Sequence, residues 1–393
     1  MIPGLDRYKK KWNITTDPAI KPGLDSITAA LKELGNPQKE GTYIHLAGSN
    51  GKGSTAAFLT AIFKEHHLSV GSFMSPHIED LHDQIQLNGK PVTPDVLDQA
   101  MEQLANIRTL LTDFELLTAA AFLVFKNEQP DVIILEAGMG GRFDSTNVIT
   151  PAVAIIPSVS LEHTNFLGPT IGDIAWHKAG VIKVHIPIII GDLPEEAEAV
   201  IRKEAKKLTA PVVLPEGVPN VSLKLKGAHQ QRNAMLAQAA AAHVLGDRFD
   251  AERADRGLAA AFIPNRFEEV APNIFFDGAH NPASVEKLVE TVKTELADRP
   301  IHVYVGILKD KDYITILRKL EEISDNFTFV DFPHERAMVA KNLYLESKGK
   351  VKTIQKVCDI LPVLHKNEVA LVTGSLYLLA EIRHLLINRQ DTK

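Results

Sequence analysis

Short, mainly apolar runs alternate with segments of helical periodicity through the first two thirds of the chain. The apolar runs have the length and composition of buried strands, and they lie at 42–46, 70–74, 131–136, 153–156 and 186–190. Apolar residues recur at helical spacing over 55–63, 95–110, 115–126 and 195–207. This order of strand, helix and strand predicts βαβ units built on a parallel-rich sheet.

The same alternation starts again in the last third of the chain. Strands are predicted at 273–277, 301–305, 327–330 and 369–373, and helices at 282–296, 313–323 and from Leu376. Between the two parts, a proline and polar residues interrupt the helical periodicity at 263–266. We therefore expect two α/β domains, a larger one over 1–263 and a smaller, doubly wound one over 264–393.

A glycine-rich turn follows the first predicted strand. Gly48, Gly51 and Gly53 allow positive φ and a close approach of the backbone, so that N–H groups can point at anionic oxygens. A helix opening at Ser54 would add the positive end of its dipole. Lys52 is placed to reach terminal phosphates, and the Ser54 hydroxyl can bind Mg²⁺. The pattern predicts a nucleotide-phosphate site rather than a plain turn.

Several polar residues lie where predicted strands end. Glu136 could hold Mg²⁺ beside the phosphate turn, or it could be an acid that only faces water. His163 alone is typical of a hydrogen-bonded structural histidine, and Lys178 alone of a surface lysine. Asp277 opens a polar turn in the second domain that suits ligand contact, although Asn281 there could simply cap the next helix.

Composition narrows the class of protein. The chain has 393 residues, 45% hydrophobic and 23% charged, with a formal net charge of −6, so it has no basic surface typical of nucleic-acid binding. Cys358 is the single cysteine, which excludes an internal disulfide and a thiolate metal cluster. The sequence has no membrane-spanning apolar run and no signal-peptide pattern at its start. A cytoplasmic enzyme is therefore expected.

Taken together, these motifs resemble the folylpolyglutamate synthases and dihydrofolate synthases of the Mur ligase superfamily. The resemblance runs in order over nearly the whole chain. It rests on the segments 20–24, 34–38, 48–55, 75–77, 136–147, 163–164, 178–180, 229–233, 277–282, 311–312 and 373–377. Two positions depart from the family pattern: Gln84 stands where an arginine is usual, and Glu162 where an aspartate is usual.

The resemblance implies a P-loop-containing Mur-ligase-like domain followed by a smaller Rossmann-like domain, and it assigns roles to residues. ATP would be bound by Gly48, Ser49, Asn50, Gly51, Lys52, Gly53, Ser54, Thr55, Asn233, Arg266 and Asp277. Two Mg²⁺ ions would be held by Ser54, Ser75, Glu136 and His163. Catalytic roles fall to Lys52, Lys178, His163, Asp277 and His280, and Lys178 matches a lysine that CO₂ can carbamylate.

The implied activity is ATP-dependent addition of L-glutamate to the γ-carboxylate of a folate through an acyl phosphate, releasing ADP and phosphate. Dihydropteroate is a second candidate acceptor, and a monomer is implied, with neither nucleic acid nor membrane as a partner. Closure of the two domains about a hinge near 263–268 would shield the acyl phosphate from water. Two alternatives remain open: a Mur-type ligase for another carboxylate, and a nucleotide-binding relative without ligase activity.

Overall fold

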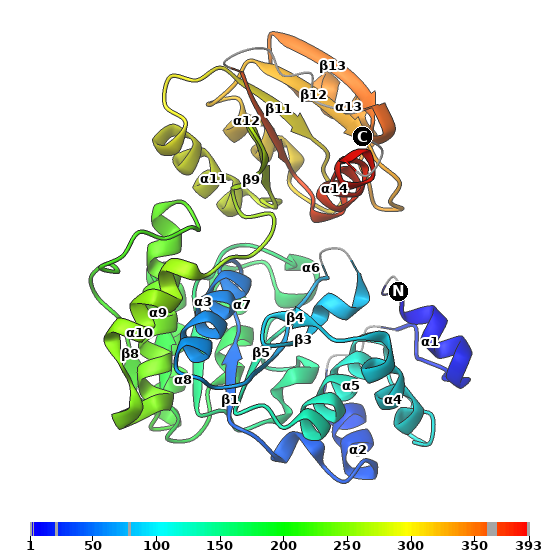
Figure 1. Cartoon of the computed structure of the whole chain (residues 1–393), viewed down its shortest axis with the longest axis vertical. Helices are drawn as coiled ribbons and strands as arrows, with labels where there is room; N and C mark the ends of the chain where they lie inside the picture. Colours follow the sequence, from blue (N-terminus) through cyan, green and yellow to red (C-terminus); the bar gives the residue numbers. More distant parts are fainter. Residues whose placement is uncertain (1, 3, 20–22, 78–79, 360–367, 391–393) are drawn as a thin grey trace. The chain divides into compact units, whose positions relative to one another are not determined.

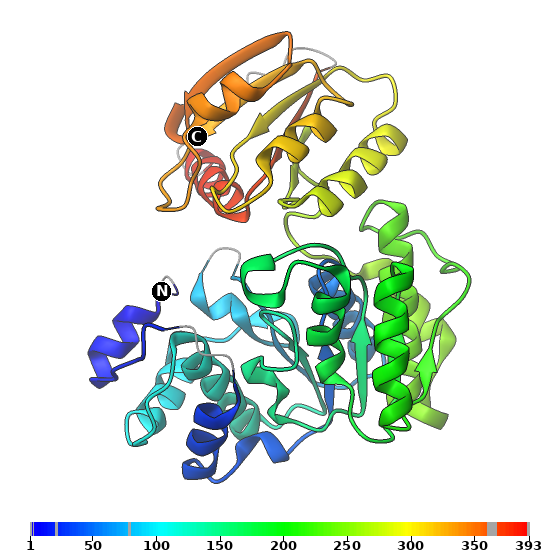
Figure 2. The same ribbon diagram turned by 180° about the vertical axis from the view of Figure 1, so that it is seen from behind.

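The computed structural model describes residues 2, 4–19, 23–77, 80–359 and 368–390. The motif at 20–24 therefore lies partly outside the described residues. The described chain forms two compact units, one of residues 1–224 and 231–262, the other of residues 225–230 and 263–393. Each unit is an α/β domain with its own sheet (Figures 1 and 2). No helix in the described part of the chain is long and apolar enough to cross a membrane.

The first unit is built on an eight-stranded sheet in the order β4-β3-β2-β5-β1-β6-β7-β8. The strands are β1 (Tyr43–Leu46), β2 (Val70–Phe73), β3 (Ile85–Leu87), β4 (Lys90–Pro91), β5 (Val132–Glu136), β6 (Val153–Ile156), β7 (Ile188–Ile190) and β8 (Val212–Val213). β1 lies near the centre and pairs in parallel with β5 and β6. β3 and β4 are antiparallel, so the predicted parallel sheet carries an antiparallel edge.

Helices cover both faces of this sheet. The α-helices of the unit are α1 (Leu5–Trp12), α2 (Asp25–Glu33), α3 (Lys52–Glu65), α4 (Pro94–Leu104), α5 (Asp113–Glu128), α6 (Thr164–Leu167), α7 (Ile171–Lys178), α8 (Glu195–Lys207), α9 (Ala228–Leu245, of which residues 228–230 belong to the second unit) and α10 (Ala251–Ala260). The helices α2, α4 and α5 bury their apolar residues against Tyr43, Phe73 and Ile133 of the sheet. The helix α3 packs on β2, β5 and α10. α7 and α8 cover β6 and β7.

The second unit has a six-stranded sheet in the order β13-β12-β11-β14-β10-β9. Its strands are β9 (Glu268–Ala271), β10 (Ile274–Asp277), β11 (Ile301–Val305), β12 (Asn326–Asp331), β13 (Val351–Lys356) and β14 (Val369–Thr373), and its helices α11 (Pro282–Glu295), α12 (Tyr313–Leu320), α13 (Ala340–Glu346) and α14 (Leu376–Gln390). All strand pairs are parallel except β9 with β10. The carboxyl ends of β10, β11 and β14 therefore meet at one edge.

The structure corrects some of the predicted elements. α3 begins at Lys52 rather than Ser54, since Gly51 is its N-cap with φ 88°. The helix predicted over 95–110 ends at Leu104. Four short or exposed strands, β3, β4, β9 and β13, were not predicted. In β13, five of the six residues are exposed, so the sequence lacks the apolar run that marks a buried strand.

Candidate functional site

The turn between β1 and α3 is fastened to the segment that follows β6. The backbone N–H of Ser49 donates to the Ser158 carbonyl at 3.0 Å. The Ser158 hydroxyl accepts from the N–H of Asn50 and donates to its carbonyl, both at 2.9 Å. Ser49 Oγ donates to the Ser160 carbonyl at 3.2 Å and accepts from the Ser160 N–H at 2.9 Å. These reciprocal bonds fix the path of the turn.

The glycines of the turn lie close to their neighbours. A Cβ atom on Gly51 would meet Asn233 Oδ1 at 2.6 Å, and one on Gly48 would meet Pro157 Cδ at 3.0 Å. Gly51 also has a positive φ, which disfavours other residues. Asn233 comes from α9 and is buried. The predicted nucleotide residue Asn233 is therefore placed directly against the glycine-rich turn.

Lys52 lies in the first turn of α3, at the positive end of the helix dipole. Its Nζ donates to the Gly48 carbonyl at 2.7 Å and lies 3.7 Å from Glu136 Oε1. Glu136 is the last residue of β5 and is only 6% exposed. The acid predicted at this strand end therefore faces the phosphate turn rather than water.

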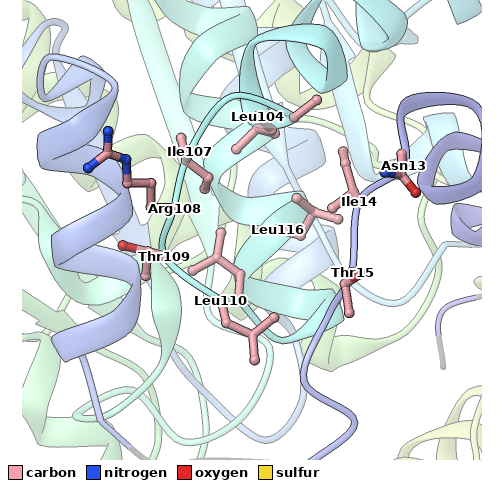
Figure 3. A pocket seen from close by; sticks show the side chains of 11 residues that line it. Asn13, Ile14, Thr15, Leu104, Ile107, Arg108, Thr109, Leu110 and Leu116 are labelled. Carbon is pink, nitrogen blue, oxygen red and sulfur yellow. The ribbon is translucent and has the colours of Figure 1, made fainter.

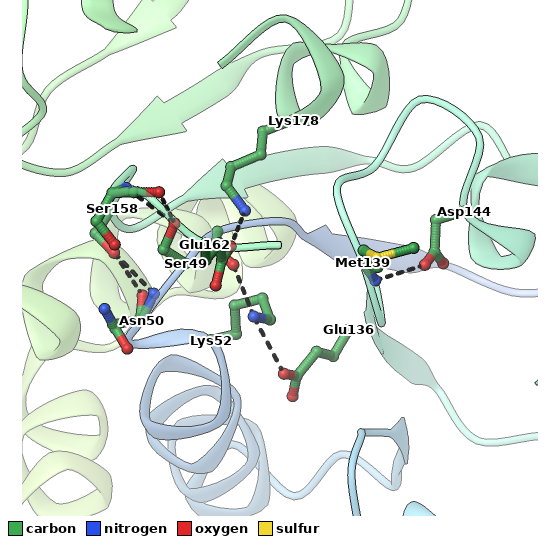
Figure 4. Close-up of polar contacts among 11 residues, drawn as sticks. Ser49, Asn50, Lys52, Glu136, Met139, Asp144, Ser158, Glu162 and Lys178 are labelled. Atoms are coloured by element: carbon green, nitrogen blue, oxygen red, sulfur yellow. Dashed lines mark hydrogen bonds and ion pairs between the residues drawn. The ribbon is translucent and has the colours of Figure 1, made fainter. Parts of the chain in front are cut away.

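A second ion pair lies beside Lys52 (Figure 4). Lys178 Nζ donates to Glu162 Oε1 at 2.6 Å, and the lysine is 1% exposed. Burial lowers the pKa of Lys178, against the opposing effect of Glu162. Burial alone would raise the pKa of Glu162, but the charges of Lys178 and Lys52 lower it to about 2. Lys178 is thus a buried partner in the site, not a surface lysine.

The loop after Glu136 is organised by a buried carboxylate. Asp144 Oδ2 accepts from the N–H of Met139 at 2.9 Å, and Oδ1 accepts from the Thr146 hydroxyl at 2.6 Å. That hydroxyl also lies 2.9 Å from Nε2 of His45, a fully buried residue of β1. Burial raises the pKa of Asp144 and lowers that of His45 to about 3. This network was not predicted from the sequence.

The predicted metal ligands occupy different surroundings. Ser54 is buried in the first turn of α3, Ser75 follows β2 and is partly buried, and His163 is exposed at the start of α6. Among the described residues, no group of three or more His, Cys, Asp or Glu side chains is placed to hold a metal. The hydroxyl of Ser54 and the carboxylate of Glu136 are nevertheless oxygen ligands of the kind that Mg²⁺ takes. This ion commonly uses one or two carboxylates together with substrate phosphates.

The remaining predicted residues, Arg266, Asp277 and His280, gather in the second unit near the carboxyl end of β10. Asp277 Oδ1 accepts from the N–H of Ala279 and Oδ2 from that of Phe267, both at 2.9 Å. Burial raises the pKa of Asp277, and the charge of Arg266 opposes the shift. His280 Nδ1 lies 2.8 Å from the Gly278 carbonyl. The structure thus brings Arg266, Asp277 and His280 to one turn of the second unit.

The Asn281 side chain also accepts from the Ser284 N–H at 2.8 Å and caps α11. The turn therefore has the helix-capping function that its sequence allowed.

A cavity of about 190 Å³ lies away from these residues (Figure 3). It opens between the segment after α1 and the loop from α4 to α5, and its lining residues are 13–15, 104, 105, 107–111 and 116. None of the residues predicted to bind ATP or metal lines it. The position of this cavity therefore does not mark the predicted ATP and metal site.

Comparison with known proteins identifies the family of this chain. Residues 265–376 match the family model "Mur ligase, glutamate ligase domain". The dihydrofolate synthase/folylpolyglutamate synthase of Bacillus subtilis is 36% identical over 93% of this chain and 95% of its own length. The chain belongs to the dihydrofolate synthase/folylpolyglutamate synthase family. The resemblance inferred from the motifs is therefore confirmed.

Solved structures of this family have the same fold. The Escherichia coli FolC complex with DHPP and ADP superimposes with a TM-score of 0.89 and 26% identity, covering 98% of both chains. The Yersinia pestis bifunctional enzyme, complexed with AMPPNP and a Mn ion, gives a TM-score of 0.87 and 26% identity, again covering 98% of both chains. The predicted two-domain α/β fold is therefore confirmed as the fold of the family.

One ion pair of this chain involves a position that departs from the family pattern. Glu162, which stands in place of the usual aspartate, forms the ion pair with Lys178. The sequence showed the substitution but not the pairing, because 16 residues separate the two side chains along the chain.

Proposed function

We propose that this chain is an ATP-dependent ligase that adds L-glutamate to the γ-carboxylate of a reduced folate. The observation that carries the proposal is the grouping of Lys52 and Glu136 at a glycine-rich turn, in a chain of this family. The named activities of the relatives support the same reaction. ATP and a divalent cation are its cofactors, in keeping with the nucleotide and Mn ion in the Yersinia pestis structure.

The reaction needs two anions to be brought together. The folate carboxylate attacks the γ-phosphorus of ATP, which gives an acyl phosphate and ADP. The amine of glutamate then attacks the acyl carbon, and phosphate leaves with one oxygen of the original carboxylate. Lys52 stabilises the negative charge that develops on the transferred phosphoryl group, and the N–H groups of residues 48–55 orient the phosphates.

Ser54, Ser75, Glu136 and His163 are the residues that would hold two Mg²⁺ ions. Bound there, the ions would neutralise phosphate charge during transfer. Arg266 and Asn233 would contact the nucleotide, and Asp277 and His280 would contact the reacting groups from the second unit. The protein would act as a cytoplasmic monomer.

Carbamylation of Lys178 is part of this proposal. Burial lowers the lysine pKa, which favours the neutral amine that can attack CO₂. A carbamate would place a carboxylate near Lys52, whose charge already acts on Lys178. If the carbamate is the working form, Lys178→Ala should lose activity and regain part of it when a small carboxylate such as acetate is added. Absence of rescue would leave Lys178 with a positional role only.

Incubation with ATP, Mg²⁺ and glutamate, together with one candidate acceptor at a time, tests the function. Tetrahydrofolate, dihydropteroate and a cell-wall precursor that carries a carboxylate are compared. Glutamate-dependent ADP release and a folate heavier by one glutamate residue support the proposal, and turnover of dihydropteroate would add the synthase activity. Turnover of the cell-wall precursor alone, or nucleotide binding without turnover of any acceptor, would overturn it.

A further inference from the structure

A clamp of three side chains in the second unit holds the segment that carries Arg266. Asn265 is fully buried, with φ 60°. Arg383 of α14 donates through Nη2 to Asn265 Oδ1 at 2.8 Å and through Nη1 to Glu268 Oε1 at 3.1 Å. Glu268 Oε2 in turn accepts from the Asn265 N–H at 2.8 Å. Each of the three residues therefore binds the other two.

The clamp continues into the turn that contains Asp277. The Asn265 carbonyl accepts from the Gly278 N–H at 2.8 Å, and the Phe267 N–H donates to Asp277 Oδ2 at 2.9 Å. Arg266 lies between these two anchored residues, so its backbone is held on both sides. A Cβ atom on Gly278 would meet Arg266 Nη1 at 2.6 Å, which shows that the guanidinium lies directly over this turn.

Asn265 and Phe267 both have positive φ, 60° and 47°. For Phe267 this conformation is costly and persists only where the surroundings impose it, whereas asparagine adopts it more readily than most residues. The pair lies next to the residue expected to approach the nucleotide, where strain of this kind often has a functional reason. The ion pair of Arg383 with Glu268 is mostly buried, so removal of Arg383 would take away a charge partner of the Glu268 carboxylate and leave it the N–H of Asn265.

We infer that Asn265, Glu268 and Arg383 are positioning residues that set the placement of Arg266 and Asp277 for the ligation reaction. The inference rests on the proposed function, in which Arg266 contacts the nucleotide. The contacts of Arg383 given above are with Asn265 and Glu268, not with Arg266 or Asp277. It acts through Asn265, whose backbone joins the two.

The first test compares Arg383→Met with Arg318→Met. Arg318 also forms a two-bond ion pair in the second unit, with Glu321 at 2.8 and 2.7 Å, and it donates to the Glu346 carbonyl. We expect both variants to lose stability, but only Arg383→Met to raise the KM for ATP, on the order of tenfold. Arg383→Lys, which keeps the positive charge, should have a KM for ATP between those of Arg383→Met and the unmodified enzyme. An equal KM in the two methionine variants would overturn the inference.

The second test separates backbone conformation from the side-chain bond. Asn265→Gly keeps access to positive φ but removes the acceptor for Arg383. We expect a rise in KM of the same order as in Arg383→Met, and a combined rise smaller than the product of the two separate rises, because the two residues share one contact. Additive effects in this double-mutant cycle would contradict the clamp. Lack of activity in the unmodified enzyme would instead refute the proposed function, so the two failures are distinguishable.

Discussion

In the proposed reaction, phosphoryl transfer depends most directly on Lys52. Its Nζ has two described partners, the Gly48 carbonyl and Glu136, and it makes little contribution to the apolar core. We predict that Lys52→Ala lowers kcat by roughly 100-fold or more, because a charge that stabilises the transition state is removed. Thermal unfolding should change little.

Lys64, at the exposed end of the same helix, provides the matched control. Lys64→Ala should keep normal kcat and normal thermal stability. Steady-state ADP release measures kcat, and circular dichroism measures unfolding. Normal turnover in Lys52→Ala would remove this lysine from the mechanism.

Some residue roles could be read from the sequence and others could not. Lys52 and Glu136 follow from short-range rules, since a glycine-rich turn and a strand-terminal acid are local patterns. The roles of Glu162 and Asp144 depend on side chains that meet only after folding. Lys178 taken alone looked like a surface lysine, because nothing in its neighbouring sequence reports that it is buried.

In the proposed reaction, the glycine-rich turn is the element that positions the phosphates. Gly51 and Gly217 both have positive φ, 88° and 92°, but only Gly51 has close neighbours for an added Cβ. We predict that Gly51→Ala and Gly217→Ala each lose about 1–2 kcal/mol of stability from backbone strain. Only Gly51→Ala should also lose nucleotide affinity, because the Cβ would displace Asn233 or the turn.

Titration calorimetry with ADP, alongside thermal unfolding, distinguishes the two effects. Equal ADP affinity in Gly51→Ala and the unmodified protein would show that the turn tolerates the added atom. The nucleotide would then bind elsewhere or less closely than we propose.

The central strand β1 carries a histidine whose burial makes stability depend on pH. His45 has a pKa of about 3 in the folded chain against 6.5 in the unfolded chain. Between these values the unfolded chain binds more protons, so stability falls as the pH falls. We predict that this one group removes about 2 kcal/mol of stability between about pH 7 and about pH 5.

Comparison with His45→Asn isolates this contribution. Denaturant unfolding at both pH values should give a smaller pH-dependent loss for the variant, even if the variant is less stable throughout. If both proteins lost the same amount of stability between the two pH values, His45 would take up its proton in the folded chain as readily as in the unfolded chain. Burial in β1 would then be incomplete in solution.

At the scale of elements, apolar strands were easier to predict than polar ones. Five strands are buried along their whole length, namely β1, β2, β5, β6 and β7. Their mainly apolar composition indicates this burial in the sequence. β9 and β13 lie at sheet edges and expose polar residues, so pairing with a neighbour, not their own sequence, defines them.

At the scale of the whole molecule, two α/β units contribute different groups to one proposed reaction. The first unit carries the phosphate turn and the metal-binding candidates, and the second carries Arg266, Asp277 and His280. The domain division at residue 263 and a hinge near 263–268 stay predictions. The described bonds of Asn265, Phe267 and Glu268 lie within the second unit, so a hinge in this stretch would lie before Asn265.

The central claim is that amide formation passes through an acyl phosphate, and oxygen transfer tests it directly. Folate labelled with ¹⁸O in its γ-carboxylate is incubated with the enzyme, ATP, Mg²⁺ and glutamate, and the released phosphate is analysed by mass spectrometry. The account predicts one labelled oxygen in phosphate for each amide formed, because the carboxylate oxygen that attacks phosphorus leaves with it. Amide formation with unlabelled phosphate would contradict the mechanism.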